Sequence, residues 1–562
     1  MNKQLIECVP NFSEGRDLNI IKQITNEIES VDGVKLLDVD PGAATNRTVV
    51  TFVGTPQAVV DAAYKAIVKA GELIDMSKHT GEHARMGATD VCPFIPVANI
   101  SMEETSEWAV KLAKQVGETT HIPTYLYGAS QPNTSRNVLS IIRAGEYEGF
   151  FEKIKKPEWK PDFGPAEYSA RSGATTIGAR DFLIAYNINL NTKSTRIANR
   201  VAFDVRETGR VAREGNPYNG KIIKDENGES VRISGTCKAV QAVGWFIDEY
   251  DVAQVSANLT NFNITPIHTF FDEVQKSCID RGVRITGSEL VGLIPLNAML
   301  DAGRHYLQKQ GRSLGVDDSE LIHIAVKSLG LDELGPFDPE KKIIEYQLRS
   351  DEDEKLVSLT AKQLANETAS ESMAPGGGSI AAYVGALGAS LGTMVANLSA
   401  NKPGWEEQTT TFSDWAVKGQ AIKQELLYLV DEDTRSFNRI IDAIRMPKDS
   451  EQEKEARKKA IEKSSQYAAE VPYKVMQTAY GSLELLQAML DIGNPASITD
   501  TGVGALCSLT AVEGASMNVR INTKDLSDRA FADKLNAKAA ELLSIAKEDF
   551  TAIIEAVNKK IV

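Results

Sequence analysis

Hydrophobic positions recur with two different periods along this chain, and the change of period divides it into two parts. In residues 1–345, stretches in which apolar and polar residues alternate are separated by segments in which apolar residues recur every three or four positions. Beyond residue 356 the second pattern is almost the only one. Alternation is typical of strands, and the longer period is typical of amphipathic helices. We therefore predict a mixed α/β region followed by an all-α antiparallel helical bundle.

The α/β region repeats one order of elements. Strands are predicted at residues 4–9, 34–40, 48–53, 91–97 and 123–127, and helices at 17–29, 56–74 and 102–116. A second series has strands at 182–190, 239–247, 252–259 and 284–291, and helices at 193–207 and 266–280. Both contain the order β-α-β-β-α-β, the split β-α-β arrangement of ferredoxin-like folds. We expect two ferredoxin-like subdomains, 1–182 and 183–348, with a ligand cleft between them.

The remaining segments are a linker, a bundle and an insertion. The charged residues 349–356 are a predicted linker, and residues 357–562 form the predicted bundle. Helices are predicted at 357–369, 379–400, 410–445, 451–490, 496–521 and 525–559. Residues 211–236 interrupt the second α/β subdomain as a polar insertion, which we expect to be a surface loop.

One segment of the bundle has the length of a membrane span. Residues 372–401 carry no charge, but they are mostly Gly, Ala and Ser. Their large apolar residues keep to one helical face, and the glycines allow neighbouring helices to approach closely. We expect a helix buried in a bundle and no membrane span.

Charge and cysteine content exclude some classes of protein. The chain has 62 Lys and Arg against 77 Asp and Glu, a net charge of −15, which argues against nucleic-acid binding. Five scattered cysteines argue against a disulfide framework, and the N-terminus has no signal-peptide pattern. We expect a cytoplasmic protein. The sequence contains neither G-x-G-x-x-G after a predicted strand nor G-x-x-x-x-G-K-[ST], the two glycine-rich motifs that bind nucleotides, so no nucleotide cofactor is predicted.

The sequence His79-Thr-Gly-Glu-His83 matches the H-x-x-E-H motif of zinc peptidases. That chemistry needs both histidines on one face of a helix, whereas Gly81 and Gly87 predict a loop. A histidine in a glycine-bracketed loop can instead serve as a general acid and base, or can be an ordinary surface residue. The spacing alone leaves these alternatives open.

A stripe in the predicted helix 410–445 contains one carboxylate. Its apolar members are Ile422, Leu426, Leu429, Phe437, Ile440 and Ile444. Asp433 occupies the missing position of this stripe, whereas Asp431 and Glu432 fall off it. A carboxylate on a buried face has a raised pKa and suits proton transfer. Equally, it can be a structural aspartate that caps another helix or pairs with an arginine.

Two glycine-rich segments can bring backbone amides close to a ligand. The first joins the two α/β subdomains and consists of Gly164, Pro165, Ala166, Glu167, Tyr168, Ser169, Ala170, Arg171, Ser172 and Gly173. The second, Gly376, Gly377, Gly378 and Ser379, opens the uncharged helix, where free amides favour anions such as carboxylates. An interdomain turn and a hinge are the alternatives.

Longer strings resemble known families. ECVPNFSEGRD (7–17), LLDVDPGAATNRTVVTFVG (36–54), GEHARMGATDVCPFIPV (81–97), DFGPAEY (162–168), GARDFLIAYNINL (178–190) and GSELVGLIPL (287–296) resemble the glutamate formimidoyltransferase family. APGGGSIAAYVGALGASLG (374–392) and LVDEDTRSF (429–437) resemble the formimidoyltetrahydrofolate cyclodeaminase family. Over nearly its whole length the chain resembles the bifunctional formimidoyltransferase-cyclodeaminase family; the insertion at 211–236 departs from the pattern.

This resemblance implies a folate enzyme of histidine degradation. The formimino group of N-formimino-L-glutamate would pass to tetrahydrofolate, and ring closure would then give 5,10-methenyltetrahydrofolate and ammonia. By motif match, His83 is the transferase acid/base, residues 164–173 bind folate and Asp433 is the cyclodeaminase acid/base. The resemblance also implies a polyglutamylated tetrahydrofolate co-substrate, no metal, channelling of the intermediate, and self-association into dimers and rings.

Overall fold

The computed structural model describes residues 4–217, 219–349 and 355–561. The packing of the chain divides it into two units. The first, a mixed α/β region, contains residues 1–302 and 322–348, and the second, a helical region, contains residues 303–321 and 349–562. The predicted succession of a mixed α/β region and a helical region is confirmed.

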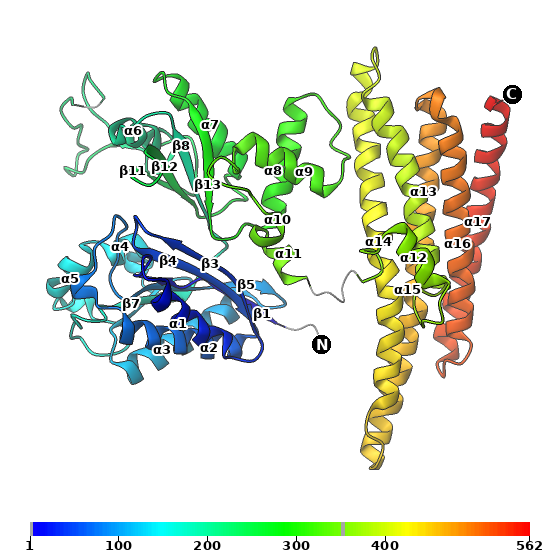
Figure 1. Cartoon of the computed structure of the whole chain (residues 1–562), viewed down its shortest axis with the longest axis horizontal. Helices are drawn as coiled ribbons and strands as arrows, with labels where there is room; N and C mark the ends of the chain where they lie inside the picture. The colour runs from blue at the N-terminus through cyan, green and yellow to red at the C-terminus, as the bar shows by residue number, and fades with distance from the viewer. Residues whose placement is uncertain (1–3, 218, 350–354, 562) are drawn as a thin grey trace. The chain divides into compact units, whose positions relative to one another are not determined.

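The first sheet of the α/β region has seven strands in the order β1-β4-β2-β5-β7-β6, with β3 paired to β4. The strands are β1 (Leu5–Cys8), β2 (Asn11–Phe12), β3 (Val34–Gly42), β4 (Arg47–Gly54), β5 (Thr89–Ala98), β6 (Thr124–Gly128) and β7 (Thr175–Ala179). Helices α1 (Leu18–Glu29), α2 (Pro56–Leu73) and α3 (Met102–Thr120) cover one face (Figure 1). Ile6, Cys8, Phe52 and Phe94 are fully buried beneath these helices. Two short helices, α4 (Leu139–Arg143) and α5 (Glu146–Lys153), follow β6.

The second sheet has four strands in the order β11-β12-β8-β13, and every neighbouring pair is antiparallel. Its strands are β8 (Ile184–Leu190), β11 (Val240–Ile247), β12 (Val252–Leu259) and β13 (Ile285–Val291), with helices α6 (Thr195–Val205) and α7 (Ile267–Ile279). The elements β9 (Arg210–Val211) and β10 (Arg232–Ile233) form a two-stranded pair in the insertion. The helices α8 (Leu296–Lys309), α9 (Asp318–Leu329), α10 (Pro339–Lys342) and α11 (Ile344–Leu348) follow β13; the part of α8 and α9 within residues 303–321 belongs to the second unit.

The two halves of the α/β region meet through the face of the first sheet that α1–α3 leave free. Leu37 and Val53 on this face form a buried apolar cluster with Leu293 and Ile344 of the second half. The backbone N–H of Gly292 also donates to the carboxylate of Asp40 at 3.0 Å. Polar side chains elsewhere on these two sheets are therefore held at fixed positions relative to each other.

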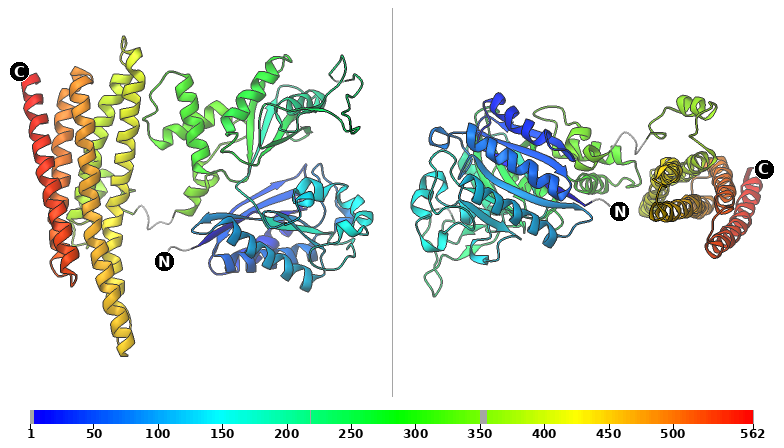
Figure 2. Two further views of the ribbon diagram at one scale, coloured as in Figure 1. Left: turned by 180° about the vertical axis from the view of Figure 1, so that it is seen from behind. Right: turned by 90° about the horizontal axis from the view of Figure 1, so that it is seen from below.

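The helical region contains α12 (Ala361–Thr368), α13 (Gly377–Ala400), α14 (Thr409–Arg445), α15 (Glu451–Ile492), α16 (Ile498–Thr523) and α17 (Arg529–Ile561). Helices α13 to α16 pack side by side, and α17 lies against α15 and α16 on the outside, as the end-on view of Figure 2 shows. The paired ends of α14 and α15 extend beyond the other helices (Figure 1).

Helix α13 is long and apolar enough to cross a membrane by length and composition, but 61% of its apolar window is buried inside the protein. Small residues explain how it packs. A Cβ on Gly388 would lie 2.6 Å from Ser508 Oγ and 2.9 Å from the carbonyl oxygen of Gly504, and one on Gly392 would lie 2.8 Å from Leu485. These glycines thus allow α15 and α16 to approach α13 closely, as a buried bundle helix requires.

Candidate active sites

The loop that carries the H-x-x-E-H motif follows the short 3₁₀ segment Met76–Lys78 and contains no α-helix. His79 uses both ring nitrogens: Nε2–H donates to the carbonyl oxygen of Asn46 at 2.8 Å, and Nδ1 accepts from Arg85 at 3.3 Å. No group of three or more His, Cys, Asp or Glu that could hold a metal occurs among the described residues. The motif therefore lacks the helix on which a zinc peptidase presents its two histidines.

His83 differs from His79 because one of its ring nitrogens is left for chemistry. Its Nδ1 lies 2.7 Å from the carbonyl oxygen of Ala84, a distance at which a neutral imidazole donates Nδ1–H. In this tautomer, which is assigned from the hydrogen bond, Nε2 keeps a lone pair that can accept a proton. The positive charge of Arg47, then burial and the charge of Arg143, lower the pKa of His83 to about 3. The imidazole is therefore neutral at physiological pH.

The positive charge beside His83 is organised by a buried carboxylate. Oδ2 of Asp90 lies 2.6 Å from Nη1 of Arg47 and 2.6 Å from Nη2 of Arg143, and Asp90 is 1% exposed. Burial alone would raise the pKa of Asp90, but the two guanidinium groups lower it overall. Oδ1 of the same carboxylate accepts the backbone N–H of Met86 at 3.0 Å. With His83 neutral, two cations and one anion leave one net positive charge.

A β-bulge aims Asp90 at this position. Asn11 of β2 pairs with Val91 and the next residue, Phe12, pairs with Thr89, so Asp90 has no partner in β2. A bulge commonly redirects a side chain next to an active site. Sequence reasoning missed Arg47, Asp90 and Arg143. The only available signal was the presence of Arg47 and Asp90 within the strings 36–54 and 81–97.

The glycine-rich segment 164–173 packs against the His83 loop. The Tyr168 hydroxyl donates to the carbonyl oxygen of Met86 at 2.6 Å, and the N–H of Ala88 donates to the carbonyl oxygen of Ser172 at 2.8 Å. Gly173 has a φ of +69°, and a Cβ there would overlap the Met86 carbonyl, so the close approach requires glycine. The structure therefore brings together two segments that are about eighty residues apart in the sequence.

In the helical region, Asp433 lies at the N-terminus of α13. Its Oδ2 accepts from the Ser379 hydroxyl at 3.1 Å, and the backbone N–H of Ser379 also donates to its carboxylate. Burial raises the pKa of Asp433 above its ordinary value, and the two hydrogen bonds from Ser379 oppose this rise. A Cβ on Gly378 would overlap the carboxyl group. The predicted segment 376–379 and the predicted aspartate thus meet in one place, where Asp433 also caps the helix.

The rest of the predicted stripe is only partly buried. Phe437 and Ile444 are 43% and 45% exposed, although the pattern predicts them as buried. Their part of α14 extends beyond the N-terminus of α13, so the helix that contacts Asp433 does not cover them (Figure 1). The burial predicted for these two residues is wrong, because their exposure depends on where the neighbouring helix α13 begins and not on the apolar pattern of α14.

Asp431 and Glu432 are 3% and 2% exposed, so their predicted position off the buried face is also wrong. Asp431 accepts the backbone N–H groups of Leu356 and Val357 at 2.7 and 3.2 Å. Glu432 accepts hydrogen bonds from four side chains on α14 and α15, namely Arg435, Arg439, Tyr428 and Tyr467. These partners compensate the two buried charges on faces that the apolar stripe does not include.

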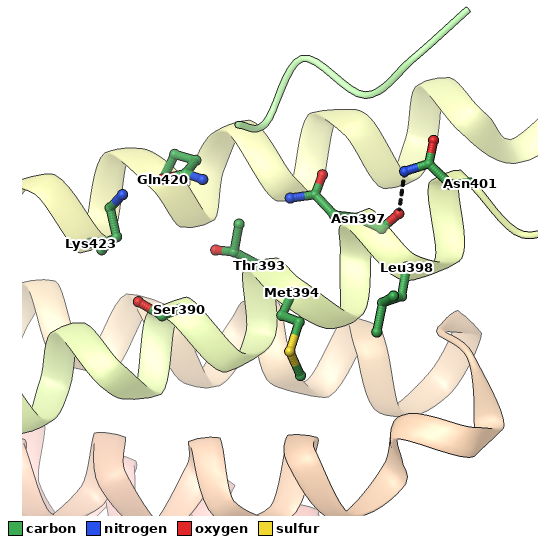
Figure 3. Close-up of a pocket in the computed structure, with 8 residues that line it drawn as sticks. All are labelled: Ser390, Thr393, Met394, Asn397, Leu398, Asn401, Gln420 and Lys423. Carbon is green, nitrogen blue, oxygen red and sulfur yellow. Dashed lines mark hydrogen bonds between the residues drawn. The ribbon is translucent and has the colours of Figure 1, made fainter. Parts of the chain in front are cut away.

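A separate hollow of about 430 Å³ lies between α13 and α14 (Figure 3). Its lining residues are Ser390, Thr393, Met394, Asn397, Leu398, Asn401, Gln420 and Lys423. Ser390 is twelve residues along α13 from Gly378, which corresponds to about 18 Å at 1.5 Å per residue. The hollow is therefore distinct from the Asp433 site.

Sequence models of three protein families match successive parts of the chain. Residues 5–180 match the formiminotransferase domain, N-terminal subdomain, residues 185–349 match the formiminotransferase domain, and residues 360–541 match formiminotransferase-cyclodeaminase. The chain is also 41% identical over 545 residues to the formimidoyltransferase-cyclodeaminase of Mus musculus, and the match covers 97% of each chain. The chain belongs to the formimidoyltransferase-cyclodeaminase family.

Two further relatives each match only one part of the chain. The glutamate formimidoyltransferase of Thermoplasma acidophilum is 41% identical over 309 residues, which cover 55% of this chain and 93% of that protein. The methenyltetrahydrofolate cyclohydrolase of Methylorubrum extorquens is 30% identical over 202 residues, 36% of this chain and 97% of that protein. The resemblance predicted from the sequence strings is confirmed. This member of the formimidoyltransferase-cyclodeaminase family is an enzyme of folate one-carbon chemistry with a transferase part and a cyclodeaminase part.

Proposed function

We propose that the α/β region transfers the formimino group of N-formimino-L-glutamate to N5 of tetrahydrofolate, a step of histidine degradation, and releases L-glutamate. The helical region then closes 5-formiminotetrahydrofolate to 5,10-methenyltetrahydrofolate and releases ammonia. One observation supports this assignment: each matched part holds its predicted titratable residue in a partly buried place with a shifted pKa, lowered for His83 in the first and raised for Asp433 in the second.

In the transfer step, N5 attacks the formimino carbon and gives a tetrahedral intermediate. His83 Nε2 accepts the N5 proton, because its lone pair is free in the tautomer that Ala84 selects. The resulting imidazolium is a strong acid and protonates the nitrogen of the departing glutamate as the C–N bond breaks. The imidazole returns to its neutral form, so protons balance over the cycle.

Arg47 and Arg143 serve this step by binding a carboxylate of the donor. A buried centre with one excess positive charge favours an anion, and formiminoglutamate carries two carboxylates. Such an anion would offset the charge that lowers the pKa of His83. Substrate binding would then raise the basicity of His83 at the moment when a base is needed.

The segment 164–173 is the proposed folate-binding segment of the transferase. Its contacts with Met86 and Ala88 support this role, because they hold the segment beside the loop that carries His83. Its exposed members include Gly164, Glu167 and Arg171, which can reach a ligand without unfolding the segment.

In the second step, N10 attacks the formimino carbon of 5-formiminotetrahydrofolate. Asp433 accepts the N10 proton and returns it to the formimino nitrogen, which leaves as ammonia. A carboxyl group whose pKa is raised by burial suits this exchange, because its two protonation states are closer in free energy at neutral pH. The amides at the start of α13, in residues 376–379, support the proposed folate contact there.

We further infer a cytoplasmic enzyme that uses polyglutamylated tetrahydrofolate and assembles into dimers and larger rings, as the family resemblance implies. We also infer that both halves of the α/β region have a ferredoxin-like fold. The strand order β11-β12-β8-β13, with α6 and α7 in the β-α-β-β-α-β succession, supports this for the second half.

A single assay tests the function. The full chain is mixed with formiminoglutamate and tetrahydrofolate, and methenyltetrahydrofolate absorbance and ammonia are followed together. We expect both products in equal amounts. Product formation that survives with both His83→Ala and Asp433→Asn would contradict the two assigned centres.

A further inference from the structure

A row of polar side chains lines the second sheet, three of them buried and the fourth, Glu289, half-buried, and the chemistry proposed for His83 does not use it. Asn187 and Asn189 lie on β8, Gln254 on β12 and Glu289 on β13. Strand pairing places Asn187 opposite Glu289 and Asn189 opposite Gln254. The intervening residues of β8 are core residues, so alternation puts this row on the face away from α6 and α7.

The row is a connected hydrogen-bond network with a carboxylate at each end: Asn189 Nδ2 donates to Glu333 at 2.6 Å, and the other end is Glu289. Oε2 of Glu289 accepts from Asn187 Nδ2 at 3.0 Å and from Gln254 Nε2 at 3.2 Å, and Oε1 accepts from the Tyr250 hydroxyl at 3.0 Å. Gln254 is fully buried and also donates to Asn189 at 2.8 Å. Because buried polar groups are costly unless paired, this network holds Glu289 in one orientation.

The charge of Glu289 is not compensated within the network. All three of its donors are neutral, and no Lys, Arg or His forms an ion pair with it in the part of the chain that the structure describes. An oriented, uncompensated carboxylate favours a ligand that presents N–H donors. The Arg47–Asp90–Arg143 centre has the opposite property, because it carries an excess positive charge.

Contacts place Glu289 on the side of the transferase site. Gly292 directly follows β13, the strand that carries Glu289, and its backbone N–H donates to the Asp40 carboxylate at 3.0 Å, so Asp40 lies at the end of this strand. Asp40 pairs with Val49 across β3 and β4, two residues from Arg47, which contacts His83. The network and His83 therefore border the same region between the two sheets.

We propose that Glu289 binds the 2-amino-4-oxopyrimidine edge of the tetrahydropterin ring, an inference that rests on the proposed transferase function. The N3–H and 2-amino groups of that edge are donors, and Oε1 of Glu289, which accepts only from Tyr250 within the network, has a lone pair left for one of them. The two carboxylates of formiminoglutamate would be repelled by Glu289 and attracted by Arg47 and Arg143. Glu289 and the arginine pair Arg47 and Arg143 thus separate the two substrates by charge. By binding the pterin edge, Glu289 determines how N5 is presented to His83.

Glu289→Gln tests this role in the full-length enzyme. The amide oxygen can still accept from Asn187 and Gln254, and its NH₂ can donate to the Tyr250 hydroxyl, so the network and fold are kept. The variant loses the charge and turns a donor toward the N–H groups of the pterin. We expect KM for tetrahydrofolate to rise about tenfold or more while KM for formiminoglutamate stays unchanged. Glu249→Gln, an exposed neighbour, is the matched control and should change neither value.

A tetrahydropterin without the p-aminobenzoylglutamate tail tests the contribution of the pterin ring alone. We expect 6-methyltetrahydropterin to compete with tetrahydrofolate in the wild type and to compete at least about tenfold more weakly in Glu289→Gln. Tyr250→Phe removes one hydrogen bond to Glu289 and should give a smaller change in the same direction. If Glu289→Gln has a lowered Tm, its weaker binding could come from lost stability, and Tyr250→Phe then provides the test.

Two outcomes would overturn the proposal. An unchanged KM for tetrahydrofolate with an unchanged Tm would make the network purely structural. A raised KM for formiminoglutamate alone would mean that Glu289 binds the cationic formimino group instead. Failure of the underlying function is distinguishable, since the wild type would then transfer no formimino group at all.

Discussion

The guanidinium of Arg47 is held beside the imidazole of His83, with Nη1 of Arg47 3.3 Å from Nδ1 of His83. Since Nδ1–H already donates to the carbonyl oxygen of Ala84, this contact is a repulsion between an N–H group and a cation that disfavours imidazolium. It is the largest of the causes that lower the pKa of His83 to about 3. The base is thus kept neutral, ready to accept a proton.

Replacing Arg47 by Met should raise the pKa of His83 toward its ordinary value of 6.5, because the largest opposing charge is removed. The pH profile of kcat/KM should then gain an acid limb near pH 6, whereas the wild type should show no such limb above pH 5. Titration of the His83 ring by NMR measures the same shift directly. Arg47→Lys keeps the charge and is the control. If the pKa of His83 rose as far in Arg47→Lys as in Arg47→Met, the charge of residue 47 would not be what lowers it in the wild type.

His83→Ala should lower formimino transfer by about 10²–10⁴-fold, the usual contribution of a general acid/base. His79→Ala should act mainly on stability, because both nitrogens of His79 hold the loop, and each lost hydrogen bond costs about 1 kcal/mol. Cyclodeamination of supplied 5-formiminotetrahydrofolate should be normal in both variants. Equal loss of transfer at equal Tm would contradict the separate roles of the two histidines.

Glu7 predicts an unusual dependence of stability on pH. It lies on β1, is 1% exposed, and has one carboxyl oxygen without a hydrogen bond in the described structure. Burial raises its pKa from 4.5 to about 7; the charge of Arg180 opposes the rise and that of Glu345 adds to it. The folded state therefore holds a proton between pH 4.5 and 7 that the unfolded state has released, so this contribution to stability is present below pH 4.5 and is lost as pH rises through 7.

The Glu7→Gln variant should remove this dependence. The pKa difference corresponds to about 3 kcal/mol at 1.36 kcal/mol per pH unit, so the variant should unfold at a higher temperature than the wild type at pH 8. At pH 4.5 the two proteins should unfold at similar temperatures, since the native carboxyl group is then protonated. Denaturation curves at both pH values measure the difference. A constant difference would mean that Glu7 does not titrate with this pKa.

Periodicity predicted most strands and helices, because each element buries one face and the pattern records that face. It was right that Leu426 and Leu429 are buried on α14, but Asp433 is only partly buried, whereas Asp431 and Glu432, predicted off this face, are buried. It could not predict the exposure of Phe437, because this depends on α13 beginning at Gly377. Where a helix is covered is decided by the lengths of its neighbours, which no local pattern contains.

The transferase centre was predicted least well by the residues themselves. His83 could be named from its motif, but Asp90 reaches it only because a bulge against β2 redirects its side chain. Arg143 comes from a separate helix more than fifty residues later and forms its ion pair through tertiary packing. Such contacts depend on strand register and on chain segments that meet only after folding.

Gly378→Ala should disable the cyclodeaminase selectively. An alanine in a helix usually stabilises it relative to glycine, but here the Cβ would overlap the carboxyl group of Asp433. We expect ammonia release to fall strongly while formimino transfer stays normal. Gly481→Ala, on α15, is the matched control, because a Cβ there makes only an ordinary contact with the Ile422 side chain at 3.5 Å. Normal ammonia release from Gly378→Ala would show that Asp433 can move without loss of activity.

Asp433→Asn tests proton exchange without a change of shape. The amide is nearly isosteric, and its oxygen can still accept from Ser379, so the N-terminus of α13 should remain capped. It cannot exchange a proton, so ring closure with ammonia release should fall by about 10²-fold or more, and 5-formiminotetrahydrofolate should accumulate because transfer continues. Asp431 is unsuitable as a control, since it holds the backbone amides of Leu356 and Val357. Asp442→Asn, exposed on the same helix, should release ammonia normally. If Asp433→Asn matched it, Asp433 would be a cap of α13 and the proton would be carried by another group.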